Sequence, residues 1–390
     1  MTGKERFLKV FAHELPDRVP VTTFIWDQGF FLSQQYDDYD SLEMEKNLLR
    51  VVEIQRQLGM DLMPRPIIDN EKYRHINWGG VNVFDQTENW EVTTEVRHEY
   101  NSKIEVSTIR TPLGTLTQEF TTFELCKNTN MFACTKKPVE KPEDLDIVIM
   151  YEPRLDENWK PYVKRVIDNT KEAVGEDGVV CPCAGNGPFN MSAALVPSSE
   201  IYCMFLAEPE FYKKIMEFSL ERIKDYVDAV IEANPETTYV GGNVPGGFLG
   251  KKFYDEYVLP YEKRYIEYVQ RTGIPTMYHN CGEVMNLVES YIDLGCRIVE
   301  PFSPPPLGDA DLAKAKELSR GEYVILGGVD QVDVLQKGTV DLVKQVTKDT
   351  VLTGKPGGKF LLQSADLLEL DTPIENIEAY VKTGIEYGGY

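Results

Sequence analysis

Apolar runs of strand length alternate with longer amphipathic stretches through the second half of this 390-residue chain. This alternation predicts strands that each lead into a helix, as in a parallel sheet. Helices are expected at 3–11, 42–58, 208–233 and 251–271, among others. Eight strand–helix units favour a (β/α)₈ barrel, although an open sheet is also compatible with the count. The predicted strands are 18–24, 62–66, 179–183, 238–242, 275–279, 297–300, 323–327 and 359–363.

The interval 67–178 breaks the rhythm of the barrel. Its first part alternates polar and apolar residues and contains turn sequences, which predicts an antiparallel β-insertion on the loop after strand two. Loops after barrel strands lie at the catalytic face, so the insertion either covers the site or is a structural or dimer-forming elaboration. No linker or repeat divides the chain, and one barrel domain is expected over residues 1–390. The insertion strands are expected at 90–100, 103–110 and 115–121.

Charge and composition narrow the range of partners. The formal net charge is −22, from 63 acidic and 41 basic residues, which argues against nucleic acid and anionic membrane surfaces. The chain has no run of about 18 apolar residues that could cross a membrane, and its N-terminus lacks a signal-peptide pattern. The seven cysteines, an odd number, argue against a disulfide framework. A reduced, cytoplasmic protein is therefore expected.

The segment Tyr278-His279-Asn280-Cys281-Gly282, at the end of strand five, carries the strongest chemical signal. Residues i and i+2 of a strand point the same way, so His279 and Cys281 can converge on one ion. Imidazole and thiolate suit Zn²⁺, and Glu300, which ends the next strand, is the candidate third ligand. The alternatives are a buried histidine beside a core cysteine, and a salt-bridged Glu300. Cys181 and Cys183 share one strand face and are expected to be core thiols.

Polar and aromatic side chains gather at the other strand ends, where a barrel enzyme binds its substrate. The polar residues either contact a ligand or cap helices, and the aromatic residues either line a pocket or pack in the core. Asp330, for example, is also a suitable N-cap for the segment that follows it. The candidate substrate-binding residues are Trp26, Phe189, Asn243, Tyr278, Asp330 and Gln363, and the candidate acids are Asp27 and Asp366.

Several segments match a known family along nearly the whole chain. The longest are GIPTMYHNCGEV and the closing DTPIENIEAYVKTGIEYG, and shorter ones are Gly187-Pro188-Phe189, Gly327-Gly328-Val329-Asp330 and the hairpin TIRTPLGTLTQEF. These segments resemble the uroporphyrinogen decarboxylase superfamily, and especially its corrinoid-dependent methyltransferase branch. The resemblance implies a (β/α)₈ barrel, in agreement with the strand count. It also implies a homodimer.

Two departures from the family pattern separate its branches. The decarboxylase carries an Arg-rich segment after strand one, whereas this chain has Trp26-Asp27-Gln28-Gly29-Phe30-Phe31 there, which suits a highly carboxylated porphyrinogen poorly. In the thiol-methylating branch, zinc is held by His-x-Cys and a later cysteine, and similar sites add a glutamate. The resemblance assigns three of these elements to His279, Cys281 and Glu300, but Ala365 replaces the last cysteine. The lost thiolate leaves room for an oxygen ligand from the substrate.

The resemblance therefore implies a methyltransferase that moves a methyl group from a small methylated substrate, such as an aryl methyl ether, to the Co(I) corrinoid of a partner protein. Zinc would act as a Lewis acid, and Asp27 or Asp366 would assist protonation. The chain lacks a D-x-H-x-x-G corrinoid signature, so the corrinoid is expected on the partner. The alternatives are methyl transfer from the corrinoid to a thiol or tetrahydrofolate, a metal-free uroporphyrinogen decarboxylase, and a non-catalytic binding barrel.

Overall fold

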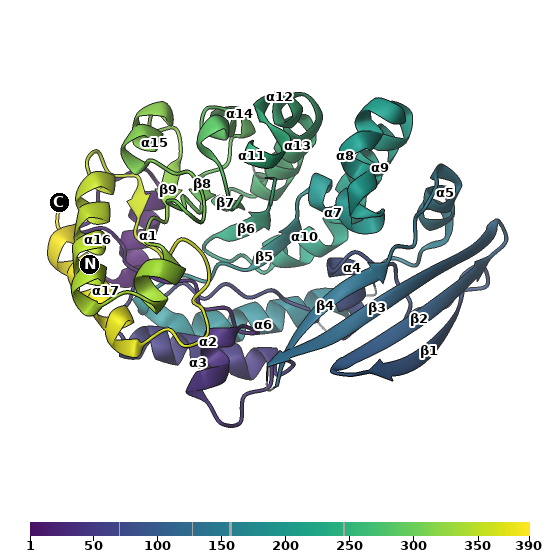
Figure 1. Ribbon diagram of the computed structural model, residues 1–390, viewed down its shortest axis with the longest axis horizontal. Coiled ribbons are helices and arrows are strands. Elements are labelled where there is room, and N and C mark those ends of the chain that lie inside the picture. Colours follow the sequence, from purple (N-terminus) through teal and green to yellow (C-terminus); the bar gives the residue numbers. More distant parts are fainter. Residues whose placement is uncertain (70, 127, 156–157, 245) are drawn as a thin grey trace.

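Six short parallel strands form the central sheet of the computed structural model, in the order β10-β9-β8-β7-β6-β5 (Figure 1). The structure describes residues 1–69, 71–126, 128–155, 158–244 and 246–390. Strands that follow one another in the chain are neighbours in the sheet, so their carboxyl ends meet at one rim. The strands are β5 (Cys183–Asn186), β6 (Thr238–Gly241), β7 (Thr276–His279), β8 (Ile298–Glu300), β9 (Val324–Leu326) and β10 (Phe360–Leu361).

Two extended segments link the edge strands β10 and β5. Parallel bridges join Val21 to Leu362, beside β10, and Leu62 to Gly178, shortly before β5. The amide of Asp61 donates a hydrogen bond to the carbonyl of Val21, which connects the two segments to each other. These segments are the first two strands expected from the sequence. The prediction of a (β/α)₈ barrel architecture is confirmed.

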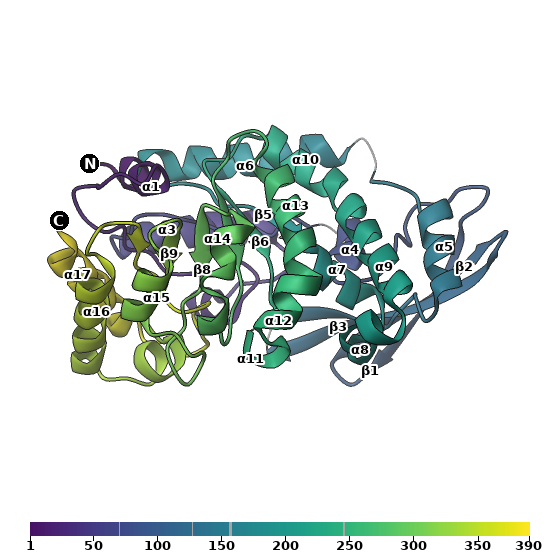
Figure 2. The ribbon, with the colours of Figure 1, turned by 90° about the horizontal axis from the view of Figure 1, so that it is seen from above.

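Helices cover the outside of these strands (Figures 1 and 2). The helix expected at 208–233 is in fact two helices, which part at Ile223. The helix expected at 251–271 contains a π-helical stretch, Tyr254–Val258. No helix within the described ranges is long and apolar enough to cross a membrane. The helices are α1 (Gly3–Phe11), α2 (Phe30–Gln35), α3 (Met44–Gln57), α4 (Glu71–Asn77), α5 (Pro142–Tyr151), α6 (Trp159–Val174), α7 (Pro188–Leu195), α8 (Ser198–Ala207), α9 (Pro209–Arg222), α10 (Lys224–Glu232), α11 (Gly246–Leu249), α12 (Lys251–Phe253), α13 (Leu259–Gln270), α14 (Ser290–Leu294), α15 (Leu312–Leu318), α16 (Val340–Gly354) and α17 (Ile374–Gly388), with shorter 3₁₀ or π segments at Gly175–Asp177, Met285–Leu287 and Gln331–Gln336.

A four-stranded antiparallel sheet interrupts the barrel between its second and third strands, in the order β1-β2-β3-β4. Figures 1 and 2 show it at the end of the molecule opposite both termini. The last strand, β4, is missed by the sequence pattern, because its buried residues Thr129, Phe132 and Cys134 do not alternate strictly. The strands are β1 (Glu91–Glu99), β2 (Ser102–Thr111), β3 (Gly114–Cys126) and β4 (Thr129–Lys136).

The first helix, α1, closes the barrel at the amino ends of its strands. Thr2 caps this helix: its side chain accepts from the amide of Glu5, and the Glu5 side chain bonds back to the Thr2 amide. The apolar face of α1, including Phe7 and Phe11, packs in one buried cluster with residues of the barrel interior. Cys181 belongs to the same cluster, and burial raises the pKa of its thiol to about 12, as suits a core thiol.

Candidate functional site

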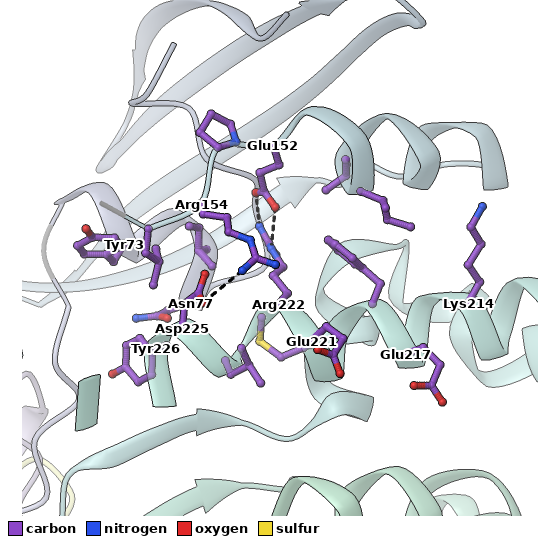
Figure 3. Close-up of a pocket in the computed structure, with 18 residues that line it drawn as sticks. Tyr73, Asn77, Glu152, Arg154, Lys214, Glu217, Glu221, Arg222, Asp225 and Tyr226 are labelled. Atoms are coloured by element: carbon purple, nitrogen blue, oxygen red, sulfur yellow. Dashed lines mark hydrogen bonds and ion pairs between the residues drawn. The ribbon is translucent and has the colours of Figure 1, made fainter. Parts of the chain in front are cut away.

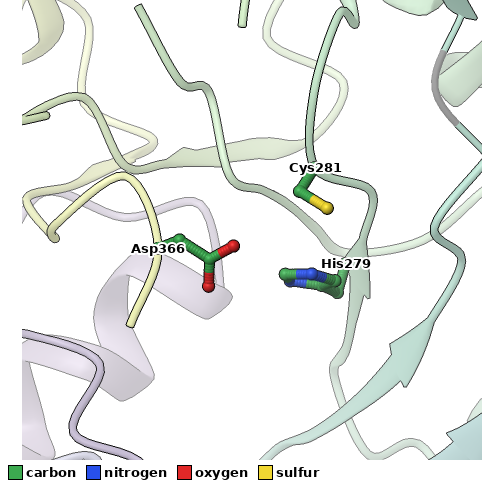
Figure 4. Close-up of side chains that lie close together, drawn as sticks. All are labelled: His279, Cys281 and Asp366. Atoms are coloured by element: carbon green, nitrogen blue, oxygen red, sulfur yellow. The ribbon is translucent and has the colours of Figure 1, made fainter. Parts of the chain in front are cut away.

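Three potential metal ligands meet at the carboxyl end of the barrel. His279 ends β7, Cys281 follows two residues later, and Asp366 lies on the segment after β10. One ligand atom from each residue lies within 4.8 Å of the other two. Figure 4 shows the three side chains pointing toward one common space. The chain directly after β7 brings Cys281 beside His279, whereas Asp366 comes from the segment after β10.

Glu300 forms a hydrogen bond with the Nδ1 of the His279 ring. The parallel register of β7 and β8 pairs His279 with Glu300, and the His279 Nδ1 lies 2.7 Å from the Glu300 Oε1. A carboxylate accepts this bond, so the proton resides on Nδ1 and Nε2 is left for another partner. The sequence predicts Glu300 as the third metal ligand, but the structure places Asp366 beside His279 and Cys281 instead. The reason is the register, which sets Glu300 alongside Nδ1.

A buried arginine completes this arrangement. The Arg65 Nη2 donates to the same Glu300 Oε1 at 2.6 Å, and both side chains are only 1% exposed. The guanidinium is sandwiched between aromatic rings, with its carbon 4.1 Å from the Phe24 centroid and 4.3 Å from that of Tyr239. The Nε and Nη1 of Arg65 have no hydrogen-bond partner among the residues that the structure describes. The guanidinium of Arg65 therefore keeps two unpaired hydrogen-bond donors at the site.

The charges of these groups oppose the effect of burial. Burial alone would raise the pKa of Glu300, but the charges of Arg65 and His279 lower it to about 2. For His279 the two effects are reversed. Burial alone would lower its pKa, but Glu300, Cys281 and Asp366 together raise the pKa well above the ordinary value. Glu300 is consequently an anion, and it stabilises positive charge on the ring beside it.

A cavity of about 520 Å³ opens above these residues. His279, Cys281, Asp366 and Arg65 all line it. Apolar surface predominates in the rest of the lining, which includes five aromatic residues that suit a flat or apolar ligand. These are Phe24, Trp26, Trp78, Tyr226 and Tyr239.

Two of the predicted substrate-binding residues, Trp26 and Asn243, line this cavity. The Asn243 Oδ1 lies 3.6 Å from the Cys281 Sγ and accepts its weak hydrogen bond. Of the two predicted acids, Asp366 lines the cavity and Asp27 lies outside the described lining. Both carboxylate oxygens of Asp27 are buried without a hydrogen-bond partner in the described part of the chain, and burial raises the pKa of this carboxyl well above its ordinary value.

The other four predicted residues lie outside the described lining of the cavity. Tyr278 precedes His279 on β7, so its side chain points to the opposite face and packs near Tyr291. Phe189 packs against Phe253. Asp330 caps the following π segment by accepting from the amides of residues 332 and 333. Gln363 is fully buried. The sequence alone gives each of them the same position at a strand end, and only packing distinguishes them.

Arg65 is the functional candidate that the sequence reasoning misses. It is the one charged residue in the strand expected at 62–66, and a charge within an apolar strand is rare unless it is paired. That feature was a usable signal. Tyr239, by contrast, alternates inward on β6 like any core residue, and nothing in the sequence marks it as a wall of the cavity.

Comparisons with known proteins agree on the fold. The uroporphyrinogen decarboxylase (URO-D) family model matches residues 122–387. A methylcobamide:CoM methyltransferase of Methanosarcina mazei is 23% identical over 255 residues, which cover 65% of this chain and 70% of the relative. A uroporphyrinogen decarboxylase of Parasynechococcus marenigrum is 26% identical over 232 residues, 57% of this chain and 63% of the relative. A solved methyltransferase from Methanosarcina mazei superposes with a TM-score of 0.70 at 17% identity and covers 99% of both chains.

Proposed function

The chain belongs to the uroporphyrinogen decarboxylase family, and on that premise we propose that it is a methyltransferase of a corrinoid system. It takes a methyl group from a small methylated substrate, such as an aryl methyl ether, and passes it to the Co(I) corrinoid of a partner protein. The observation that carries the proposal is the group His279, Cys281 and Asp366 at one end of an aromatic-lined cavity. The relative named as a methylcobamide:CoM methyltransferase supports the corrinoid partner.

The donor set fits zinc. Imidazole nitrogen, thiolate and carboxylate oxygen are all zinc ligands, and three protein ligands with an open fourth position are typical of a catalytic site. His279, Cys281 and Asp366 would hold the ion, and Glu300 would keep the His279 ring in the required tautomer. Zinc held there supplies a Lewis acid for the ether oxygen of the substrate.

Arg65 is suited to the leaving oxygen. In the proposed reaction the O–CH₃ bond breaks and its electron pair stays on oxygen, while Co(I) provides the electron pair for the new bond to the methyl group. The product oxygen is thus an anion. Arg65 lines the cavity, and its Nε and Nη1 are unused donors that would favour this charge. The aromatic walls would hold the ring and exclude water. Asp27, which lies outside the described lining, has no direct contact with the substrate in this proposal.

The cavity is poorly suited to a highly carboxylated porphyrinogen. Arg65 is the one lysine or arginine among its described lining residues, and Glu300 already balances its charge. Asp366 adds an anion of its own. Decarboxylation of such a substrate is therefore disfavoured, as the absence of an Arg-rich segment after strand one also indicates.

The third ligand bears on the direction of transfer. Ala365 is fully buried, and the neighbouring Asp366 offers an oxygen where the thiol-methylating branch has a cysteine. An oxygen donor makes the ion harder than a second thiolate would, which favours an oxygen-bearing substrate over a thiol. The reverse transfer, from methyl-corrinoid to a thiol, is the second candidate, because it is the reaction named for the Methanosarcina mazei relative.

A spectroscopic assay tests the proposal. Zinc-loaded protein is mixed with reduced cob(I)alamin and a panel of methoxybenzenes, with Cys281→Ala as the matched control. We expect the spectrum of methylcobalamin to appear with an equal amount of phenol, and only with the wild-type protein. Consumption of methylcobalamin that requires an added thiol, with no reaction of the ethers, would support the second candidate. Decarboxylation of uroporphyrinogen without metal would contradict both.

A further inference from the structure

A second cavity, of about 410 Å³, lies outside the barrel beside α4, α5, α9 and α10 (Figure 3). Apolar side chains form most of its wall, among them Val148, Ile149 and Phe218. Asn77 and Tyr226 line both this outer cavity and the barrel-mouth cavity, so the two share a wall. The Tyr226 hydroxyl is bound to the Ile68 carbonyl at 2.9 Å, which keeps this ring in place between them.

Two unused hydrogen-bond donors distinguish this cavity from an ordinary apolar hollow. Among the described residues that line it, two have a buried side-chain donor without a partner, which are the Arg222 Nη1 and the Asn77 Nδ2. The other guanidinium nitrogens of Arg222 are occupied, because they donate to Glu152 and to the Gly80 carbonyl. Arg222 is itself a buried group, with a side chain only 8% exposed. A buried donor is rarely left unpaired, so both atoms call for an acceptor.

The charges around the cavity select a neutral acceptor. Glu152 forms an ion pair with Arg222 and thereby balances its charge (Figure 3). Two further acids of the lining are also paired with arginines. The Asp225 Oδ1 lies 3.7 Å from the Arg154 Nη1, and the Glu217 Oε1 lies 2.6 Å from the Arg264 Nη1. An anionic ligand on Arg222 would therefore lie close to the Glu152 carboxylate and be repelled by it. A carbonyl or ether oxygen accepts the same hydrogen bonds without this repulsion.

We propose that the outer cavity is a second binding site, for a neutral apolar compound with one or two acceptor oxygens. Its oxygen binds the Arg222 Nη1 and the Asn77 Nδ2, and its apolar body packs against Val148, Ile149 and Phe218. The volume is in the range of small-molecule sites. The proposal does not depend on the methyltransferase reaction, since Arg222 lines the outer cavity and is not among the described lining residues of the barrel mouth.

Calorimetric titration with three similar ligands tests the chemistry of the site. Acetophenone provides the carbonyl, ethylbenzene has the same shape without it, and benzoate replaces it with an anion. We expect acetophenone to bind at least about 5-fold more tightly than either of the others, because only it satisfies the donors without repulsion. Equal affinity for ethylbenzene, tighter binding of benzoate, or no saturable binding of acetophenone would overturn the proposal.

Variants distinguish the outer cavity from the barrel mouth, which could bind the same compounds. Ile149→Trp fills the outer cavity at a residue that is 47% exposed, so the fold should tolerate it. The matched control is Leu206→Trp, at a residue that is 73% exposed and outside the described lining. We expect Ile149→Trp to lose the acetophenone site and the control to bind as the wild type does. Unchanged affinity in Ile149→Trp would contradict the proposal, and near-ultraviolet circular dichroism checks that each variant is folded.

Discussion

Two buried arginine–glutamate pairs lie beside the two cavities, and they differ in what else the carboxylate binds. In the pair Arg65–Glu300, one oxygen of Glu300 accepts from both Arg65 and His279. In the pair Arg222–Glu152, the carboxylate binds Arg222 through both oxygens and also accepts from the amide of Asn82. The first pair is thus joined to a side chain that can bind an ion, and the second to the main chain.

This difference explains why similar pairs serve different purposes. Glu300 sets the tautomer and orientation of His279, so the first pair acts on the chemistry of the barrel mouth. The second pair fixes the main chain that follows α4, because Arg222 also donates to the Gly80 carbonyl. Each pair leaves at least one donor unused, but only Arg65 is placed to meet a developing charge.

The largest expected effect is on zinc binding. Asp366→Ala and Cys281→Ala each remove a proposed ligand, and we expect the zinc affinity to fall by more than the roughly 10–100-fold typical of losing an outer partner. The loss of zinc affinity in Glu300→Gln should lie within that smaller range, because this variant loses only the group that orients His279. Competition titration with a chelating dye measures all three. Stronger loss in Glu300→Gln than in Asp366→Ala would restore Glu300 as the ligand.

The two pairs should also differ in stability. Removing one partner of a fully buried pair typically costs about 3–5 kcal/mol, which we expect for Glu300→Ala in the zinc-free protein. Glu152→Ala should cost less, about 1–3 kcal/mol, because its pair is 8–9% exposed and water can reach the remaining charge. Urea denaturation measures both free energies of unfolding. Equal losses would show that the difference in burial has no energetic consequence.

A third buried carboxyl, Glu262, has no arginine partner among the described residues and sharpens the comparison. Burial raises its pKa to about 8, although the amide of Phe189 donates to it at 3.2 Å and has the opposite effect. The unfolded chain has a lower pKa, so unfolding releases a proton between the two values. Stability should therefore fall as the pH rises toward 8, by at most about 1.4 kcal/mol per pH unit from this group.

Glu262→Gln removes that dependence. We expect the variant to show a flatter profile of unfolding free energy than the wild type between about pH 5 and pH 8. Chemical denaturation over this interval measures it. An unchanged slope would mean that Glu262 is already ionised in the folded protein.

The smallest effect is expected at Asp330, which follows β9. Its carboxylate caps the segment Gln331–Gln336, and Asp330→Ala should lower the stability by about 1 kcal/mol. Asp330→Asn keeps an acceptor and should be close to the wild type. Zinc affinity should be the same in all three proteins, and a loss of affinity would return Asp330 to the site.

Periodicity in the sequence was sufficient for the barrel. Strand-length apolar runs predict a strand at or next to each observed barrel strand, because the side-chain pattern of a strand is a local property. The largest shift is at β5, which begins at Cys183, the last residue of the strand expected at 179–183. Local rules fail where tertiary packing intervenes. The helix expected at 208–233 divides at Ile223, and β4 is missed because its buried residues do not alternate.

The candidate site also has a part that local sequence predicts and a part that depends on tertiary packing. The sequence by itself determined that His279 and Cys281 share a direction, since residues i and i+2 of an extended segment need only local geometry. Only the tertiary structure decided that Asp366 joins them, that Glu300 turns to Nδ1, and that Arg65 lies beneath. These contacts join segments up to 235 residues apart, and they depend on strand register and loop path, which no local pattern encodes.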